Sequence, residues 1–218
     1  MTHLYNAKSP SLPLPQEEYN YSQQEQLLNA LRLYFNRIDN ALLNLSNTDG
    51  GGFLHFPHAM FSSAVNQSST ANNTPTLLTA EVTNMSSGVA MDAGQITVVK
   101  NGTYRVQYAI QFINTDAQAH DSTVWFKKNG TAVAYSGSKF ETRSTHGGDN
   151  GHLLASTEFL VDLTAEDYLE IWWAADQVKT GIQDGIDIEY LAASVSPYTR
   201  PIIPSVTIVV TFVCAALE

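Results

Sequence analysis

The sequence predicts a mainly β fold: an antiparallel jelly-roll sandwich with an N-terminal extended arm and one α-helix. From about residue 53 onward, short apolar runs are separated by turns that contain Gly. Within residues 104–113, apolar and polar side chains alternate with the period of two typical of a half-buried strand. In residues 21–45 the apolar residues recur at helical spacing instead, which predicts the helix.

Residues 1–20 are expected to form the extended arm. They contain Pro, Ser and Asn and show no periodicity, so we expect them to be ordered only where something holds them. Residues 1–16 also lack the apolar core of a secretory signal peptide, and no leader is expected.

Residues 21–46 are predicted to form an amphipathic helix. Ser22 and Glu25 match the capping box, in which two side chains satisfy free backbone amides at a helix start. The apolar stripe steps by three and four residues and consists of Leu28, Leu31, Phe35, Ile38, Leu42 and Leu45. Such a stripe fits a helix that packs on its own domain, a bundle of identical helices, or docking on a partner. The Gly-rich residues 47–52 are expected to end the helix and form a flexible joint.

Residues 53–218 are assigned to the jelly-roll domain. Strands are predicted at residues 53–65, 75–82, 95–99, 102–115, 122–129, 131–141, 152–163, 168–176, 185–194 and 204–213. Turn-forming pairs such as Asn101-Gly102, Asn129-Gly130 and Asp184-Gly185 lie between them. Many short strands with turn signals between them are typical of an antiparallel sandwich or barrel.

The densest positive charge of this acidic chain lies beside one predicted turn. Lys127 and Lys128 directly precede Asn129-Gly130, a pair that tolerates the positive φ values of a type I′ hairpin turn. We therefore interpret the two lysines as structural: they keep the turn solvated and oppose edge-to-edge pairing of strands.

Composition excludes two classes of partner. The formal net charge of −10 argues against nucleic acid, because phosphate binding needs clustered Lys and Arg. The most apolar stretch, residues 204–217, is shorter than the roughly 20 residues of a membrane span, so no membrane insertion is expected. Charged residues make up only 15% of the chain, against about a quarter in ordinary soluble proteins. A surface poor in charge is common where one subunit packs against others.

The single cysteine, Cys214, excludes an internal disulfide and a cysteine-rich metal site. It lies in the apolar stretch near the end of the chain, so a buried structural thiol is predicted.

We expect no catalytic residue, cofactor or metal. His55 and His58 lie close in sequence, but no third ligand follows in a recognisable spacing. His146, Asp149 and His152 fall in one Gly-rich loop, which is interpreted as a polar turn, with a zinc or calcium loop as the alternative. No nucleophile elbow, phosphate loop or dinucleotide fingerprint occurs. An enzyme such as a depolymerase is the least favoured function.

Trp172 and Trp173 are adjacent in a predicted strand and therefore face opposite sides of the sheet. One of the two is expected in the core, and its neighbour then faces solvent, a second sheet or another subunit. Tryptophan is enriched at the centres of interfaces, so one of the pair, with Tyr168 nearby, is a candidate for contact between subunits. Packing entirely within the chain is the alternative.

Motifs across roughly residues 53–213 resemble a family of bacteriophage virion proteins with a jelly-roll domain. The family pattern comprises a Gly-Thr-Tyr strand, a Gln-Phe and Thr-Asp pair, a Trp followed by Lys-Asn-Gly, an Asp-Tyr strand with Glu, and a closing Pro-Ser-Val strand. The matching residues are Gly102, Thr103, Tyr104, Gln111, Phe112, Thr115, Asp116, Trp125, Lys128, Asn129, Gly130, Asp167, Tyr168, Glu170, Pro204, Ser205 and Val206. The usual Gly before Asp-Tyr is Glu166 here.

Two further likenesses extend this comparison. The pattern more loosely resembles the C1q and tumour-necrosis-factor trimers. Residues 31–40 of the predicted helix resemble a segment in small structural proteins from phages of cyanobacteria and other aquatic bacteria. The resemblance implies a homotrimer, a place on the virion and no cofactor.

The function expected from these observations is non-enzymatic. The chain is expected to be a homotrimeric phage structural protein, attached through its arm and helix as a capsid decoration, a head fibre or a tail component. Its partners would be itself and other capsid or tail proteins. The residues expected in oligomer or anchor contacts are Leu28, Leu31, Phe35, Ile38, Leu42, Leu45, Tyr168, Trp172 and Trp173. The alternative is a tail module that binds a receptor or a host surface glycan through loop 144–151 and exposed aromatics such as Tyr135 or Tyr198.

Overall fold

The structure, a computed structural model, describes residues 11–12, 20–46 and 56–215. The chain divides into two units, residues 1–55 and 56–218, and each is described by itself. Most of the predicted arm and the whole predicted joint at 47–52 lie outside the described residues.

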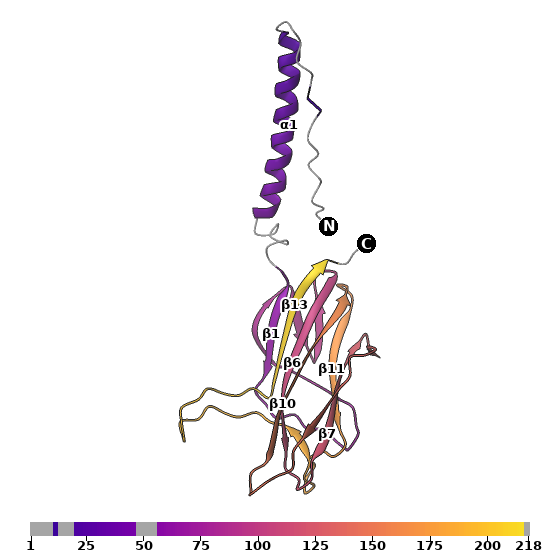
Figure 1. The fold of residues 1–218 in the computed structure, drawn as a ribbon, viewed down its shortest axis with the longest axis vertical. Helices are drawn as coiled ribbons and strands as arrows, with labels where there is room; N and C mark the ends of the chain where they lie inside the picture. The colour runs from indigo at the N-terminus through magenta and orange to yellow at the C-terminus, as the bar shows by residue number, and fades with distance from the viewer. Residues whose placement is uncertain (1–10, 13–19, 47–55, 216–218) are drawn as a thin grey trace. The chain divides into compact units, whose positions relative to one another are not determined.

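The first unit contains helix α1 (Tyr21–Ser46) (Figure 1). Asn20 caps its start, because the Oδ1 atom of Asn20 accepts hydrogen bonds from the backbone amides of Ser22 at 2.9 Å and Gln23 at 3.4 Å. The predicted cap at Ser22 is therefore wrong. Ser22 already lies within the helix, and the amides that a cap must satisfy are bonded to Asn20.

The second unit is a sandwich of two antiparallel sheets, which confirms the predicted fold class. Sheet A has the order β10-β6-β13-β1-β3, with β12 also paired to β6. Its strands are β10 (Gly151–Leu163), β6 (Gly102–Asn114), β13 (Val206–Ala215), β1 (His58–Ser63), β3 (Val82–Ser87) and β12 (Ile186–Ile188). The long first and last strands of the domain, β1 and β13, pair with each other.

Sheet B has the order β4-β5-β11-β7-β8, with β2 also paired to β11 and β9 to β7. Its strands are β4 (Val89–Asp92), β5 (Gln95–Val98), β11 (Tyr168–Ala175), β7 (His120–Lys128), β8 (Thr131–Ala132), β2 (Thr76–Leu77) and β9 (Ser138–Thr142). The central pair is β7 with β11, in which Trp125 lies opposite Trp172 and Val124 opposite Trp173.

Aromatic side chains join the two sheets in the core. The ring centroids of Phe112 on β6 and Trp173 on β11 lie 5.7 Å apart, and those of Tyr108 and Phe126 lie 5.9 Å apart. All four side chains are buried. Burying side chains of this size stabilises a fold by about 1.5–3 kcal/mol each, so these contacts between the sheets carry much of the sandwich.

Two of the departures from the predicted strand pattern concern residues 82–92 and 131–141. Strands β3 and β4 occupy residues 82–92, where only residue 82 was predicted as strand, because Asn and Ser there have low strand propensity. The predicted strand 131–141 is interrupted by residues 133–137. Within that interruption Tyr135 has φ of 61°, and the Ser136 hydroxyl accepts a hydrogen bond from the Phe126 amide at 3.1 Å.

Cys214 is exposed, so the prediction of a buried thiol is wrong. The alternation that buries Val206, Ile208 and Val210 ends at a register shift between Phe212 and Cys214. Beyond that shift, the last residues of β13 extend past the core. An apolar residue at this end of the strand is therefore not necessarily buried.

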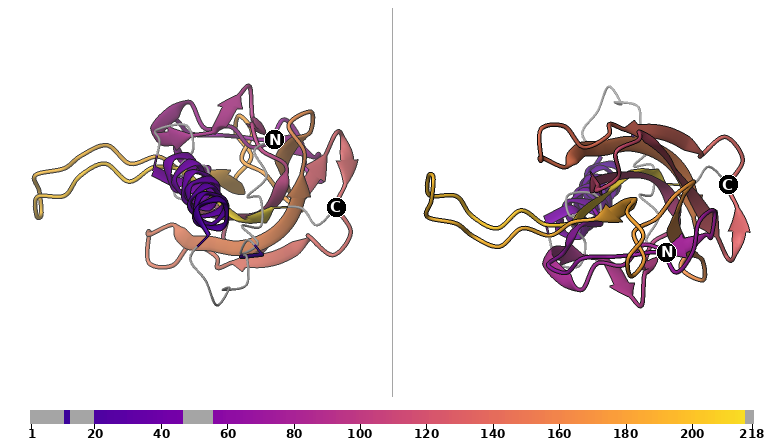
Figure 2. Two further views of the ribbon diagram at one scale, coloured as in Figure 1. Left: turned by 90° about the horizontal axis from the view of Figure 1, so that it is seen from above. Right: turned by 90° about the horizontal axis from the view of Figure 1, so that it is seen from below.

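A hairpin projects from the sandwich between β12 and β13. The predicted strand 185–194 ends as β12 at Ile188, and the chain continues into this projecting hairpin, residues Tyr190–Ile203. Figure 1 shows it extending sideways from the domain, and the two views of Figure 2 show it clear of both sheets. Bridges between Leu191 and Ile203 and between Ser194 and Arg200 hold its two arms together.

Candidate oligomerisation surfaces

The stripe of α1 exposes large apolar side chains. Leu28, Phe35 and Leu42 are 57%, 57% and 55% exposed, while Leu31 and Ile38 are partly exposed. The side chain of Leu45 lies outside the described residues. An apolar stripe on a surface helix normally faces a core or a partner. The stripe of α1 is therefore the first candidate surface for contact with another chain.

The structure separates the two adjacent tryptophans. Trp173 is 0% exposed in the core of its own chain, so it is removed from the candidate interface residues. Trp172 is partly exposed and belongs to the outer face of sheet B, opposite Trp125 on β7.

Side chains of the same chain already engage Trp172. The Lys127 ammonium lies 3.7 Å from its ring centroid, a cation–π geometry. Its Nε1 atom donates a hydrogen bond to Glu170 Oε2 at 3.0 Å, and Gln95 Nε2 donates to Glu170 Oε1 at 3.0 Å. Tyr168 is partly exposed on the same strand. That Trp172 and Tyr168 lie in a subunit contact stays a prediction.

The outer face of sheet A is a second candidate surface, which sequence reasoning missed. Leu154 and Leu160 on β10 are 56% and 57% exposed. The same face also presents Met60, Met85 and Val209, which lie opposite one another in register across β1, β3 and β13. The sequence did contain a signal for this face. In β10, Leu153-Leu154 and Phe159-Leu160 are pairs of consecutive apolar residues, and each pair places one member on each side of the sheet.

The charged side chains on this face have partners, because Asp162 accepts a hydrogen bond from the Thr103 hydroxyl and Asp187 accepts one from the Ser68 hydroxyl. Of the outward-facing residues on β6, namely Thr103, Arg105, Gln107, Ala109 and Gln111, only Arg105 carries a charge. It lies 4.0 Å from Glu158 on β10, with both side chains at least half exposed. An exposed pair of this kind contributes little to stability. The face is therefore wide and exposes apolar side chains between partnered charges, a mixture that surfaces between subunits also show.

The Lys-Asn-Gly motif forms a type I′ turn, as predicted. Asn129 and Gly130 have φ of 51° and 76° between β7 and β8. Lys128 Nζ lies 2.8 Å from Asp167 Oδ2, and Asn129 Nδ2 donates to Asp167 Oδ1 at 2.6 Å. Thr164 donates to the same carboxylate from its amide and its hydroxyl, at 2.7 and 2.9 Å.

These four residues, Lys128, Asn129, Thr164 and Asp167, are called the turn clamp below. The clamp ties the β7–β8 turn to the β10–β11 turn. Burial acts to raise the pKa of Asp167, but hydrogen bonds from Lys128, Thr164 and Asn129 outweigh it and hold the pKa well below its ordinary value.

These contacts, rather than protection of a sheet edge, account for Lys127 and Lys128 beside the turn. Strand β7 is flanked by β11 on one side and by β8 and β9 on the other, so it is not an edge strand. The interpretation that Lys127 and Lys128 oppose edge pairing is therefore wrong. Lys127 covers Trp172 and Lys128 completes the turn clamp, so both cations stabilise sheet B.

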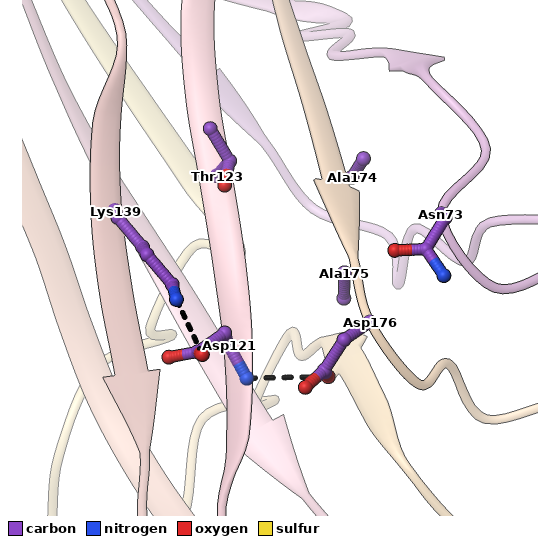
Figure 3. A pocket seen from close by; sticks show the side chains of 7 residues that line it. All are labelled: Asn73, Asp121, Thr123, Lys139, Ala174, Ala175 and Asp176. Carbon is purple, nitrogen blue, oxygen red and sulfur yellow. Dashed lines mark hydrogen bonds and ion pairs between the residues drawn. The ribbon is translucent and has the colours of Figure 1, made fainter.

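A shallow pocket of about 270 Å³ lies on the outer face of sheet B (Figure 3). Its lining comprises Asn73, Asp121, Thr123, Lys139, Ala174, Ala175 and Asp176. Lys139 Nζ forms an ion pair with Asp121 Oδ2 at 2.7 Å, and the Asp121 amide donates to Asp176 Oδ1 at 3.2 Å. Lys139 and Asp121 thus satisfy each other, Asp176 accepts from a backbone amide, and the pocket presents no arrangement of nucleophile and base.

His120 is buried between two carboxylates at the end of β7. Its Nε2 atom lies 2.9 Å from Asp116 Oδ2, and its Nδ1 atom lies 3.2 Å from Asp176 Oδ1. The hydrogen bond with His120 lowers the pKa of Asp116. This cluster links the β6–β7 turn to the end of β11 and reads as structural.

The described histidines that the sequence offered as metal ligands make ordinary hydrogen bonds or ion pairs instead. His58 bonds the Phe56 carbonyl oxygen, while His55 lies outside the described residues. His146 and Asp149 pair through their backbones, and His152 Nδ1 lies 3.7 Å from Glu189. Across the part of the chain that the structure describes, no group of three His, Cys, Asp or Glu is placed to hold a metal ion. The described helix does not have the length and apolar character that crossing a membrane requires.

The strand order and the antiparallel pairing define the second unit as a jelly-roll sandwich. No family model matches the chain. None of the curated proteins matches it either. Among solved structures, the Eiger TNF of S. frugiperda is similar at 12% identity with a TM-score of 0.42, over 75% of this chain and 96% of that one.

Proposed function

We propose that this chain is a non-enzymatic structural component of a bacteriophage virion, in which three copies associate and attach to the particle through their N-terminal arm and helix. Capsid decoration, head fibre and tail component are the sites it would suit. The observation that carries the proposal is the exposed apolar stripe of α1. The resemblance of the turn-clamp motif and its neighbours to phage jelly-roll proteins supplies the virion context.

The stripe favours a bundle of three helices over a pair. Its residues fall in two alternating positions, with Leu28, Phe35 and Leu42 in one and Leu31 and Ile38 in the other. Leu and Phe in the first position with Leu and Ile in the second form the continuous apolar seam along which identical helices can pack. Leu27 and Tyr34 adjoin the stripe at helical spacing and are partly exposed, so the apolar surface is wider than one partner helix would cover.

The outer face of sheet A supplies a second surface for the same association. A stable interface of standard size buries about 1,600 Å² in total. Leu154, Leu160 and Met85 are each more than half exposed on this face, so it holds apolar area for such a contact. Helix and sheet together would hide apolar surface that a single copy leaves in water.

The test is the mass of the purified full chain in solution. Light scattering at micromolar concentration and neutral pH is expected to give three times the mass of one chain, 23.9 kDa. Removal of residues 1–45 is expected to reduce the number of copies in the assembly. A chain that stays monomeric would overturn the proposal.

A second experiment tests the virion location. The protein is labelled on intact particles and located by electron microscopy, and absence of label would contradict that location.

Tyr135 favours a second candidate, a tail module that binds a receptor or a host glycan. Its ring is 101% exposed on a left-handed backbone with φ of 61°. The neighbouring Ser136 holds this loop, because its hydroxyl donates to the Val133 carbonyl oxygen at 2.8 Å. The candidate predicts adsorption of the protein to host cells that is lost in Tyr135→Ala. Full retention of adsorption by that variant would count against it.

A further inference from the structure

The projecting hairpin has a firm base and an unsupported tip. At the base, the Glu189 amide donates to the Gln111 carbonyl oxygen at 2.9 Å, and the Tyr190 amide donates to Asn66 Oδ1 at 2.7 Å. Toward the tip, the amides of Ser194 and Arg200 donate to each other's carbonyl oxygens at 3.1 and 2.9 Å. Figure 2 shows the hairpin extending clear of the two sheets in both views.

The hairpin exposes apolar side chains at its tip and along one arm. Val195 and Tyr198 are 83% and 67% exposed, and Ile202 is 50% exposed. A two-stranded hairpin alone is marginally stable in water, because each strand lacks a further neighbour and an apolar face to pack on. A hairpin that is both extended and apolar at its end gains most from lying on another surface.

The base of the hairpin adjoins the outer face of sheet A. Gln111, which holds the base, lies opposite Leu154 in the β6–β10 ladder. His152 on the same strand lies 3.7 Å from Glu189. The exposed Leu154 and the projecting hairpin therefore belong to one continuous surface of the sandwich.

We infer that the projecting hairpin of one copy packs on the outer face of sheet A of a neighbouring copy. Each chain carries both the hairpin and the face that receives it. A contact between two different patches closes into a ring when the rotation between copies allows it, and every hairpin then finds a face. The inference deepens the proposed function, because it rests on the association of identical copies.

Charge identifies the second copy as the occupant. At a net charge of −10, identical copies repel one another, so contacts between them are best made by surfaces with few charges. Arg200 is the one charged residue of the hairpin, and its Nη1 atom is bonded to the Ala192 carbonyl oxygen at 2.8 Å. The face it would meet presents amides, hydroxyls and apolar groups, and its charged side chains have partners: Arg105 is paired with Glu158, and Asp162 and Asp187 accept hydrogen bonds from the Thr103 and Ser68 hydroxyls.

Crosslinking in the full chain tests the contact. A photoreactive amino acid is placed at Tyr198, and labelled and unlabelled copies are mixed so that links between copies differ in mass from links within one. The expected links join position 198 to residues 105–111, 154–160 or 207–211 of another copy. Absence of such links, or links confined to one copy, would overturn the inference.

A pair of matched variants provides an independent measurement. Val195→Ser with Tyr198→Ser is expected to raise the dissociation constant of the assembly about tenfold or more. The control is Ile182→Ser with Tyr135→Ser, which removes one aliphatic and one tyrosine side chain of even greater exposure from loops elsewhere. Equal dissociation constants for the two variants would contradict the inference. A monomeric wild-type chain would contradict the proposed function itself. A trimer without the crosslinks would contradict only the hairpin contact.

Discussion

At the scale of single residues, adjacent side chains in one strand have opposite roles. Trp173 is enclosed between the sheets and contacts Phe112, whereas Trp172 lies on the outer face under Lys127. The sequence shows that the two tryptophans point in opposite directions, but the pairing of β11 with its neighbours decides which one is inside.

Substitution separates the two tryptophans. Trp173→Ala removes a fully buried aromatic side chain and leaves a cavity, so we expect the free energy of unfolding to fall by about 3–5 kcal/mol. Trp172→Ala removes a partly exposed ring and its contact with Lys127, and the expected loss is about 1 kcal/mol. Urea denaturation of both variants measures the difference. Equal losses would mean that the core assignment is mistaken.

The turn clamp concentrates three hydrogen bonds and one ion pair on a single carboxylate. Asp167→Asn removes the charge that Lys128 faces and places an amide where acceptors are needed. Because hydrogen bonds to charged groups contribute about 1.5–3 kcal/mol and the site is partly solvated, we expect a loss of about 1–2 kcal/mol in the free energy of unfolding. Asp149→Asn, in an exposed loop, is the control and should lose almost nothing.

The same clamp has a dependence on pH with a defined sign. The pKa of Asp167 is lower in the folded chain than in the unfolded chain, so its stabilisation is complete above the ordinary aspartate range and is lost as the pH falls through the lower value. Asp116 acts in the same direction. Asp187, whose pKa burial raises, acts in the opposite direction, so the comparison is made against Asp167→Asn. The wild type should lose more stability than that variant between pH 5 and pH 3 in denaturation experiments.

At the scale of elements, regular patterns were predictable and interruptions were not. Strands β6, β7, β10 and β11 follow the alternation of their side chains, and the Asn129-Gly130 turn follows from the φ values those residues tolerate. Strands β3 and β4 escaped prediction because the exposed edge strand β3 needs no apolar face, and its Asn and Ser side chains resemble a loop. Cys214 was misplaced because periodicity cannot show where a strand passes beyond the core.

Of the candidate surfaces, the stripe of α1 could be predicted from the sequence and the outer face of sheet A could not. The stripe of α1 is visible in the sequence because it repeats at helical spacing. The outer face of sheet A is assembled from six strands that are distant in the chain, so only their pairing brings Leu160, Met85 and Val209 onto one side. The projecting hairpin looks like a strand in sequence, and only the structure shows that it has no neighbour.

The cap of α1 provides a test at this scale. Asn20→Ala removes the acceptor for the first free amides of the helix, which costs about 1 kcal/mol of local stability. Hydrogen exchange of the Ser22 and Gln23 amides should become about fivefold faster in that variant. Ser22→Ala should leave it nearly unchanged. Faster exchange in Ser22→Ala instead would restore the capping box predicted from the sequence.

At the scale of the whole molecule, association is the property on which the proposed function depends. A chain with few charges still repels its copies at a net charge of −10, so apolar burial must exceed that repulsion for an assembly to form. In a trimer each substitution in α1 is repeated three times. The helix is therefore the most sensitive place to measure the balance between apolar burial and charge repulsion.

Two substitutions in the stripe of α1 measure that balance. Phe35→Ser with Leu42→Ser removes two exposed apolar side chains, each expected to bury area worth about 1.5–3 kcal/mol on association, so the dissociation constant should rise by at least 100-fold. The control, Asn36→Ser with Asn40→Ser, changes exposed polar positions of the same helix and should leave the assembly intact. Sedimentation equilibrium across nanomolar to micromolar concentrations compares them. If both variants keep the trimer mass down to the same concentration, the helix acts as an anchor to another virion protein and the sheets alone hold the copies together.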